Sequence, residues 1–246
     1  MDSKSTLRAN QGRRGFHAAI KESLGGNAVK NEQKIIQQIC DGGPNMFDTF
    51  SPNIIADNFR KGASLQALIP MLRHKDPQIA SAGAWIASEV IDRNYGWEIF
   101  AEISNLLYHS EPAVRFWAIS SFAFLAKAEN RTDLAQFISL IDDDNIGVRK
   151  QALRYLCIIS EGALDGIRDI PFVKLVLHDA NKDDILNNVR SENNLTRRIA
   201  IAGTVRNFGV DAEFINRVKH FLSDDERFEV EDIQDITGAK MKCLNP

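Results

Sequence analysis

Histidine is the residue type in this chain whose spacing first suggests acid–base or metal chemistry. Two of the five histidines, His74 and His109, lie 35 residues apart in similar segments, and an acid follows each two residues later as Asp76 and Glu111. Imidazole and carboxylate groups together can bind a metal ion. The two histidines are too far apart to complete a set of metal ligands without further residues. The sequence therefore favours a hydrogen bond between each imidazole and a helix end in an exposed turn. The remaining histidines are His17, His178 and His220.

Three acidic clusters suggest paired carboxylates or a divalent cation: Asp142–Asp144, Lys182–Asp184 and Asp224–Glu226. A calcium loop needs a glycine and a terminal glutamate at fixed spacing, and these clusters lack both. Two of them fall in predicted turns before helices, where acids stabilise the start of the following helix. We therefore expect solvated turns, whose shared acidic edge offers a second option for a basic partner.

Motifs of established enzymes are missing from the sequence. It contains no HExxH, GxSxG, phosphate-binding loop, GxGxxG or His-Glu dipeptide, and Cys40, Cys157 and Cys243 form no CxxC pair. Their number and spacing suggest neither a disulfide framework nor a zinc site. We accordingly predict no catalytic residue, no metal ligand and no cofactor, and the cysteine usage fits the cytoplasm.

Aromatic and arginine residues recur at one position of a repeating pattern, and this is the most distinctive candidate site. On the helix that follows Pro112, the side opposite Val114 and Ala118 carries aromatic residues together with Ser120. Residues at matching positions one repeat earlier or later are Trp or Arg, the types enriched at binding hot spots. Packing between repeats would also explain them. The predicted partner-binding residues are Trp85, Phe116, Trp117, Phe124, Arg154, Arg198 and Arg206.

The elements that position these residues are predicted from an internal repeat. Each copy has an apolar pair, a polar turn containing an acid, and then an apolar residue, Arg and a small residue. Copies start at Leu72, Leu107, Ile141 and Val189, with a weaker one at Leu222, so the first separations are 35 and 34 residues. The longer separation of 48 residues before Val189 places an insertion within residues 161–182.

Each copy is predicted to form two helices, because apolar residues recur at three- and four-residue spacing on both sides of the turn. Pro77 and Pro112 suit the first turn of the second helix. Breaks are therefore expected near Lys75-Asp76, Ser110-Glu111, Asp143-Asp144, Glu192-Asn193 and Asp224-Asp225. Upstream, residues 31–40 and a segment starting at Pro52 predict two helices that cap the apolar end of the array.

The turn-Asp-Pro-x-Val-Arg-x-x-Ala pattern, over roughly residues 65–238, resembles the HEAT-repeat family, particularly its short bacterial variety. The resemblance implies an all-α, right-handed α-solenoid of about five helix pairs with a divergent N-terminal cap, whose second helices line a concave surface. It also implies that Arg115, Arg149 and Arg197 bridge to a turn acid of a neighbouring repeat. Ala80 replaces the arginine in the first copy, so the ladder is expected to stop there, and Thr196 replaces the valine in the fourth.

Composition limits the classes of protein that fit. With 44% hydrophobic residues, 26% charged residues and a net charge of −3, the chain can form a core and has no global field that attracts phosphate. No apolar run is long enough for a membrane helix, and the N-terminus does not resemble a secretory signal. We predict an N-terminal arm over residues 1–26, either partly flexible or a loosely docked helix from Phe16 to Leu24, and one domain over residues 27–246.

These observations favour a non-catalytic protein that holds a macromolecular partner, most simply another protein, on the concave face. One version is a bacterial immunity or inhibitor protein that neutralises a toxin, by analogy of fold. HEAT-like DNA alkylpurine glycosylases are the alternative, because Trp85, Trp117, Arg154 and Arg198 resemble the residue types of their groove. The net negative charge disfavours nucleic acid. Bilin lyases also resemble short HEAT chains, but no residue here indicates a tetrapyrrole site.

Overall fold

The computed structural model of the chain describes residues 32–92, 95–170, 172–227, 230–231 and 233–234. The arm and the helix expected within residues 1–26 lie outside these ranges. The chain divides into two compact units, Met1–Ile103 and Ser104–Pro246, and each is described by itself.

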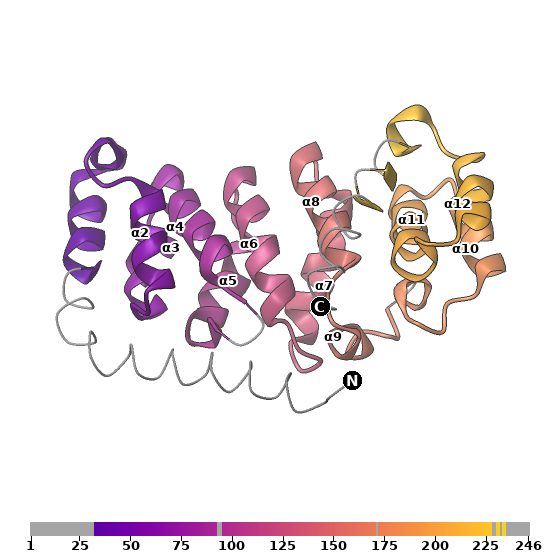
Figure 1. Cartoon of the computed structure of the whole chain (residues 1–246), viewed down its shortest axis with the longest axis horizontal. Coiled ribbons are helices and arrows are strands. Elements are labelled where there is room, and N and C mark those ends of the chain that lie inside the picture. The colour runs from indigo at the N-terminus through magenta and orange to yellow at the C-terminus, as the bar shows by residue number, and fades with distance from the viewer. Residues whose placement is uncertain (1–31, 93–94, 171, 228–229, 232, 235–246) are drawn as a thin grey trace, which may run out of the picture. The chain divides into compact units, whose positions relative to one another are not determined.

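Unit 1 is built from short helices that pack on a longer one, α4 (Pro77–Val90) (Figure 1). Helix α2 (Pro52–Arg60) and helix α3 (Ile69–Leu72) both pack on α4. Their apolar side chains form the core of this unit, which includes Ile55, Phe59, Met71, Ile79 and Ile86. The other elements are a helix over residues 32–42, the 3-10 helices η1 (Pro44–Asp48), η2 (Leu65–Leu68) and η3 (Trp97–Ile99), and α5 (Phe100–Leu106), which crosses the boundary between the units.

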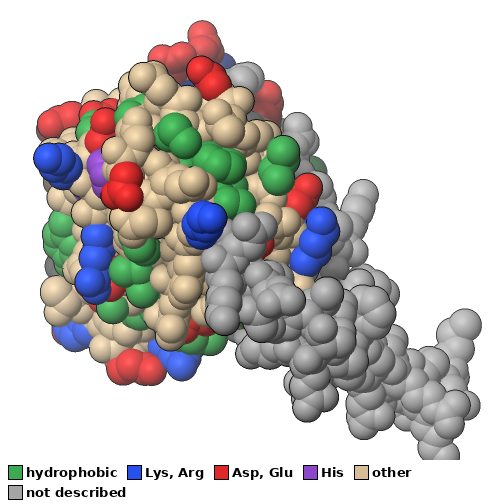
Figure 2. All heavy atoms as spheres, turned by 90° about the vertical axis from the view of Figure 1, so that its left-hand side faces the viewer, with side chains coloured by type: hydrophobic (Ala, Val, Ile, Leu, Met, Phe, Trp, Pro, Cys, Tyr) green, Lys and Arg blue, Asp and Glu red, His purple; other side chains and the backbone are tan. Residues whose placement is uncertain are grey.

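Figure 2 shows the surface of unit 1 at the left-hand end of Figure 1. Hydrophobic side chains gather in a band on this surface, with basic and acidic side chains around them. Helix α2 buries Ile55, Ala56 and Phe59, while Ile54 is 63% exposed. The first helices of the described part therefore leave apolar surface accessible as well as covering the core behind them.

Unit 2 is centred on three longer helices, α6 (Pro112–Leu125), α8 (Ile146–Leu156) and α11 (Asn194–Phe208). Helix α8 packs against both α6 and α11. The shorter elements are α7 (Arg131–Ser139), η4 (Leu140–Asp142), α9 (Glu161–Asp165), η5 (Val173–Val176), α10 (Lys182–Val189) and α12 (Ala212–Lys219). Residues 224–227, 230–231 and 233–234 are also helical.

The insertion predicted within residues 161–182 forms α9, η5 and the turns around them. Both η5 and α10 pack on α11. Contact with η5 is close at Gly203, where a Cβ atom would lie 2.1 Å from the carbonyl oxygen of Leu175. A glycine is therefore required for α11 to approach η5 this closely.

The predicted helix starts are explained by capping side chains. The carboxylate of Asp76 accepts a hydrogen bond from the Gln78 amide at 2.9 Å, and Asn145 and Asn193 cap α8 and α11 in the same way. Pro77 and Pro112 occupy the first turns of α4 and α6 as predicted. Four of the five predicted breaks are confirmed. The fifth was placed too late, because residues 220–223 form the break and Asp224 already begins the next helical segment.

The all-α fold class is confirmed for the described part of the chain. Its residues form no β-strand, and the backbone pairing of Asp92 with Tyr95 is an isolated bridge. Among the helices within the described ranges, none combines the length and the apolar character needed to cross a bilayer.

Candidate interaction surface

Aromatic side chains of α6 and α8 form two half-buried pairs in unit 2. The rings of Phe116 and Trp117 meet edge to face with centroids 4.8 Å apart. Farther along α6, Phe124 meets Tyr155 of α8 edge to face at 5.9 Å. All four side chains are half-buried, so each packs on the protein and still reaches the surface. We call Phe116, Trp117, Phe124 and Tyr155 the aromatic surface.

The orientation predicted for α6 is correct for its core side and wrong for Ser120. Val114, Ala118, Phe122 and Leu125 are fully buried. Ser120, expected on the exposed side, is only 3% exposed, and its hydroxyl donates to the Trp117 carbonyl at 2.9 Å. Phe116, Trp117 and Phe124 stand three or four residues away from it, on the same side of the helix. These larger side chains cover the small side chain of Ser120. The spacing of residues in the sequence does not reveal this burial.

Two predicted binding arginines instead bind groups within the protein. Arg206 donates from Nη1 to the carbonyls of Leu156 and Ile159, at 3.0 and 2.8 Å, and from Nη2 to Glu161 at 2.9 Å. Its side chain is 9% exposed, so it holds α11 against the end of α8 and is a structural residue. Arg198 pairs with Asp142 across 56 residues of sequence and donates to the Ile141 carbonyl. The expected exposure is therefore wrong for Arg206 and only partly right for Arg198, whose side chain is 22% exposed, whereas the predicted role of both in binding a partner stays a prediction.

The other predicted residues divide between the two units. Arg154 is half-buried on α8, the helix that supplies Tyr155 to the aromatic surface. Trp85 is half-buried on α4 and therefore belongs to unit 1, whereas the remaining six predicted residues belong to unit 2. Within unit 2 the structure brings together Phe116, Trp117 and Phe124 on α6 beside the α8 helix that carries Arg154.

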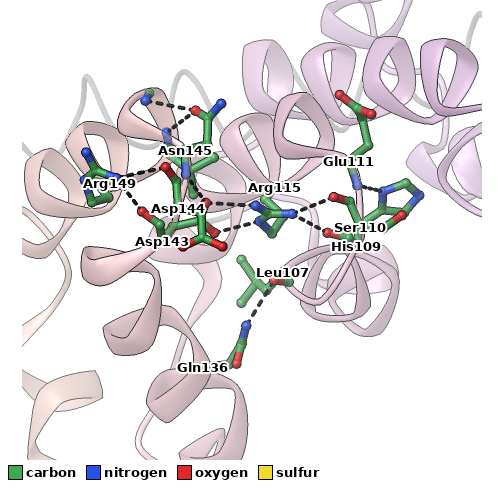
Figure 3. Close-up of polar contacts among 12 residues, drawn as sticks. Leu107, His109, Ser110, Glu111, Arg115, Gln136, Asp143, Asp144, Asn145 and Arg149 are labelled. Carbon is green, nitrogen blue, oxygen red and sulfur yellow. Dashed lines mark hydrogen bonds and ion pairs between the residues drawn. The ribbon is translucent and has the colours of Figure 1, made fainter.

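A separate polar network fixes the turns that precede the second helices (Figure 3). Arg115 pairs with both carboxylate oxygens of Asp143 at 2.8 Å and also donates to the carbonyls of His109 and Ser110. The side chains of Arg115 and Asp143 are only 14% and 7% exposed. A bidentate pair shielded in this way joins the turn before α6 to the turn before α8.

The bridges that the family resemblance implies are present at two of three positions. Arg197 pairs with both carboxylate oxygens of Glu226 and caps the carbonyls of Val189 and Phe221. Burial raises the pKa of Glu226, but hydrogen bonds from Arg197 and Ser223 outweigh it, and the pKa lies below its ordinary value. Arg149 departs from the prediction, because its Nη1 donates to the carbonyls of Asp143 and Asp144 in its own turn.

Further ion pairs at almost the same sequence separation were missed from the sequence. Arg60 pairs with Glu89, Arg73 with Glu102 and Lys182 with Asp211, each across 29 residues, against 28 for Arg115 and Asp143. The recurrent separation of a cation and an acid is a signal that a search for repeated charge spacing would have found. Ala80 stands where an arginine would form one of the expected bridges. Unit 1 nevertheless contains ion pairs at other positions of its helices.

Both turn histidines bind to backbone groups, in agreement with the sequence. Nδ1 of His74 and Nδ1 of His109 each accept the amide hydrogen of the residue two positions later, at 3.0 Å. Nε2 of His74 lies 3.2 Å from the Cys40 carbonyl, which makes it the donor of that contact. Within the described ranges no three His, Cys, Asp or Glu side chains are grouped so that they could hold a metal ion.

No family model matches the chain, and no curated protein matches it. Among solved structures, the chain is similar to the crystal structure of an engineered protein, a Northeast Structural Genomics Consortium target. The two share 15% sequence identity over 90% of this chain and 95% of that chain, with a TM-score of 0.41.

Proposed function

We propose that this chain is a non-catalytic binding protein, built from HEAT-like helix pairs, that holds a protein partner on the aromatic surface beside Arg154. The observation that carries the proposal is the half-burial of two edge-to-face aromatic pairs, Phe116 with Trp117 on α6 and Phe124 of α6 with Tyr155 of α8. Apolar area that stays accessible after folding contributes favourable free energy to binding when a partner covers it. Trp, Tyr and Arg are the usual anchors of such contacts. An inhibitor protein that neutralises a toxin is one version of this role, by analogy of fold.

The ion pairs of Arg198 and Arg206 bear on which class of partner the chain can bind. Both cations are paired with carboxylates of the same chain, so neither offers its full charge to a phosphate group. A nucleic-acid-acting enzyme such as a glycosylase needs a basic lining for the phosphates. The pairing therefore supports a protein partner over DNA, and the binding contribution is expected from Trp117 and Arg154.

The proposal is tested with Trp117→Ala and Arg154→Ala, using the partner that co-purifies with the protein from its native host and is identified by mass spectrometry. Each substitution is expected to weaken binding by about 2 kcal/mol or more, roughly thirtyfold in Kd, because anchors of this type dominate interface energies. Both variants should remain folded, and their melting temperatures should stay near that of the parent.

Phe122→Ala is the matched control, since Phe122 lies on the same helix as Trp117 and is fully buried. Truncating a core phenylalanine is expected to cost about 3–5 kcal/mol of stability. If Trp117→Ala loses as much stability as Phe122→Ala and keeps its affinity for the partner, Trp117 is a packing residue and the proposal fails. A steep loss of affinity with salt would identify nucleic acid instead.

A further inference from the structure

Four apolar side chains at the junction of η1 and α2 are not fully covered by unit 1. Met46 and Phe47 lie on η1, a 3-10 helix that buries none of its residues. Phe50 is also half-buried, and Ile54, in the first turn of α2, is 63% exposed. The amides of Thr49 and Phe50 both donate to the Met46 carbonyl, at 3.0 and 2.8 Å, so this stretch is bent. We call Met46, Phe47, Phe50 and Ile54 the apolar turn, and a segment that covers it would bury apolar area.

The residues around the apolar turn carry negative charge. Residues 35–59 contain no lysine or arginine and three acids, all of them exposed. These acids are Asp41, Asp48 and Asp57. Arg60 pairs with both Asp57 and Glu89, so a single cation serves two carboxylates. An excess of negative charge therefore remains beside the apolar turn, and it favours a basic segment as the cover.

Glu32 adds an unpaired carboxylate oxygen at the start of the described part of unit 1. The residue begins the helix over residues 32–42 and is only 5% exposed. Its Oε2 atom is buried and accepts no hydrogen bond from the described residues. A buried oxygen without a donor costs free energy, so a cation placed here would stabilise the unit. The segment that precedes Glu32 is the nearest source of such a cation in the sequence.

This preceding segment has the complementary composition. Residues 1–31 hold six of the 30 lysine and arginine residues of the chain but only two of its 33 acids, which gives a net charge of +4 here and −7 over residues 32–246. Phe16, Ile20 and Leu24 recur at four-residue spacing, which predicts a helix with one apolar side. Gly25 and Gly26 follow as a signal for the end of that helix.

The segment is also long enough to reach the apolar turn. Seven residues separate Leu24 from Glu32, and a fully extended chain of this length spans about 25 Å. The helix over residues 32–42 is about 16 Å long. Residues 16–24 can therefore run back along this helix to the apolar turn, which follows its far end. Figure 2 views unit 1 from the end at which the described chain starts and shows a band of hydrophobic side chains there.

We infer that residues 16–24 form a helix that docks on the apolar turn of the same chain. Its apolar side covers the apolar turn, and the cations of residues 1–31 face the acids of unit 1. Charge favours this occupant over a second copy of the apolar turn, because two copies would bring acids against acids. The inference concerns unit 1 alone, so it neither depends on nor tests the binding function proposed for unit 2.

Hydrogen–deuterium exchange of the full chain tests this docking. Ile20→Asp places a charge on the apolar side of the predicted helix, and Ala18→Asp places the same charge on its opposite side. We expect residues 44–60 to exchange about tenfold faster in Ile20→Asp than in the parent, because the docked helix protects them. Ala18→Asp should exchange like the parent, and residues 146–156 of unit 2 should be unaffected in both. Equal exchange of residues 44–60 in the parent and Ile20→Asp would overturn the inference.

A second pair of variants locates the docking site on the apolar turn. Ile54→Asp is expected to speed exchange of residues 44–60 as Ile20→Asp does, while Asn53→Asp, at the exposed neighbouring residue, should not. The double variant Ile20→Asp, Ile54→Asp should exchange no faster than either single variant, because both substitutions break one contact. Fully additive effects would show two separate contacts and reject the assigned site. Circular dichroism confirms that each variant keeps the helical content of the parent.

The protein concentration distinguishes docking within one chain from docking between chains. Docking in the same chain predicts that the protection of residues 44–60 is equal in dilute and concentrated samples, with the mass of one chain in analytical ultracentrifugation. Protection that appears only in concentrated samples, together with a doubled mass, would assign the surface to a second copy and overturn the inference.

Discussion

At the scale of single residues, burial decides how much an arginine–aspartate pair contributes. The pairs Arg115–Asp143 and Arg131–Asp169 are both bidentate, at 2.8 and 2.6 Å. The side chains of the first are 14% and 7% exposed, and those of the second are 51% and 70% exposed. Water and salt screen the second pair, whereas removal of Arg115 leaves a carboxylate shielded from water without its partner.

We therefore predict that Arg115→Ala destabilises the protein by about 3–5 kcal/mol, because a buried charge loses its partner. Arg131→Ala is the matched control, and its melting temperature should stay close to that of the parent. Thermal unfolding followed by circular dichroism compares the two. Equal small changes in both variants would contradict a central role for the network around Arg115.

At the scale of the element, α6 must keep small residues on its core side so that neighbouring helices can approach it. Ala118 is completely buried there, whereas Ala113 is exposed five residues earlier on the same helix. We predict that Ala118→Phe lowers the free energy of unfolding by about 1–3 kcal/mol, because the added ring overpacks the core. Chemical denaturation of Ala118→Phe and Ala113→Phe measures the difference. A stability of Ala118→Phe equal to that of Ala113→Phe would show that α6 is rotated from its described orientation.

At the scale of the whole molecule, both units contain carboxylates whose pKa is lowered by arginine. The hydrogen bond from Arg73 holds the pKa of Glu102 below its ordinary value of 4.5, and the hydrogen bonds at Glu226 outweigh its burial to the same effect. The unfolded chain binds protons more readily at such groups. Their contribution to stability is therefore complete above the unfolded pKa and is lost as the pH falls through the lower, folded pKa.

We predict that the melting temperature stays nearly constant from neutral pH to about pH 5 and falls below it, by about 2–4 °C for each kcal/mol lost. Glu226→Gln should be less stable than the parent at neutral pH and should lose less stability on acidification. Glu192→Gln, which changes an exposed turn residue, is the control. An identical decline on acidification in the parent and Glu226→Gln would refute the assignment to this pair.

The sequence by itself determined the helical class, the positions of most breaks and the buried side of α6, because these depend on local periodicity, proline and capping residues. Asp76, Pro77 and Asn145 act within a few positions of their own place in the chain. For the same reason, the turn histidines were correctly expected to bind backbone groups.

Only the tertiary structure decided the candidate surface, because it depends on what each side chain meets from distant segments. Arg206 was predicted to bind a partner, yet it bonds to Leu156, Ile159 and Glu161, which lie 45 to 50 residues away in the sequence. Tyr155 joined the aromatic surface only through its contact with Phe124 of another helix. A repeat pattern specifies which side of a helix a residue occupies, but the pairing of charges and rings across helices follows from how closely those helices approach.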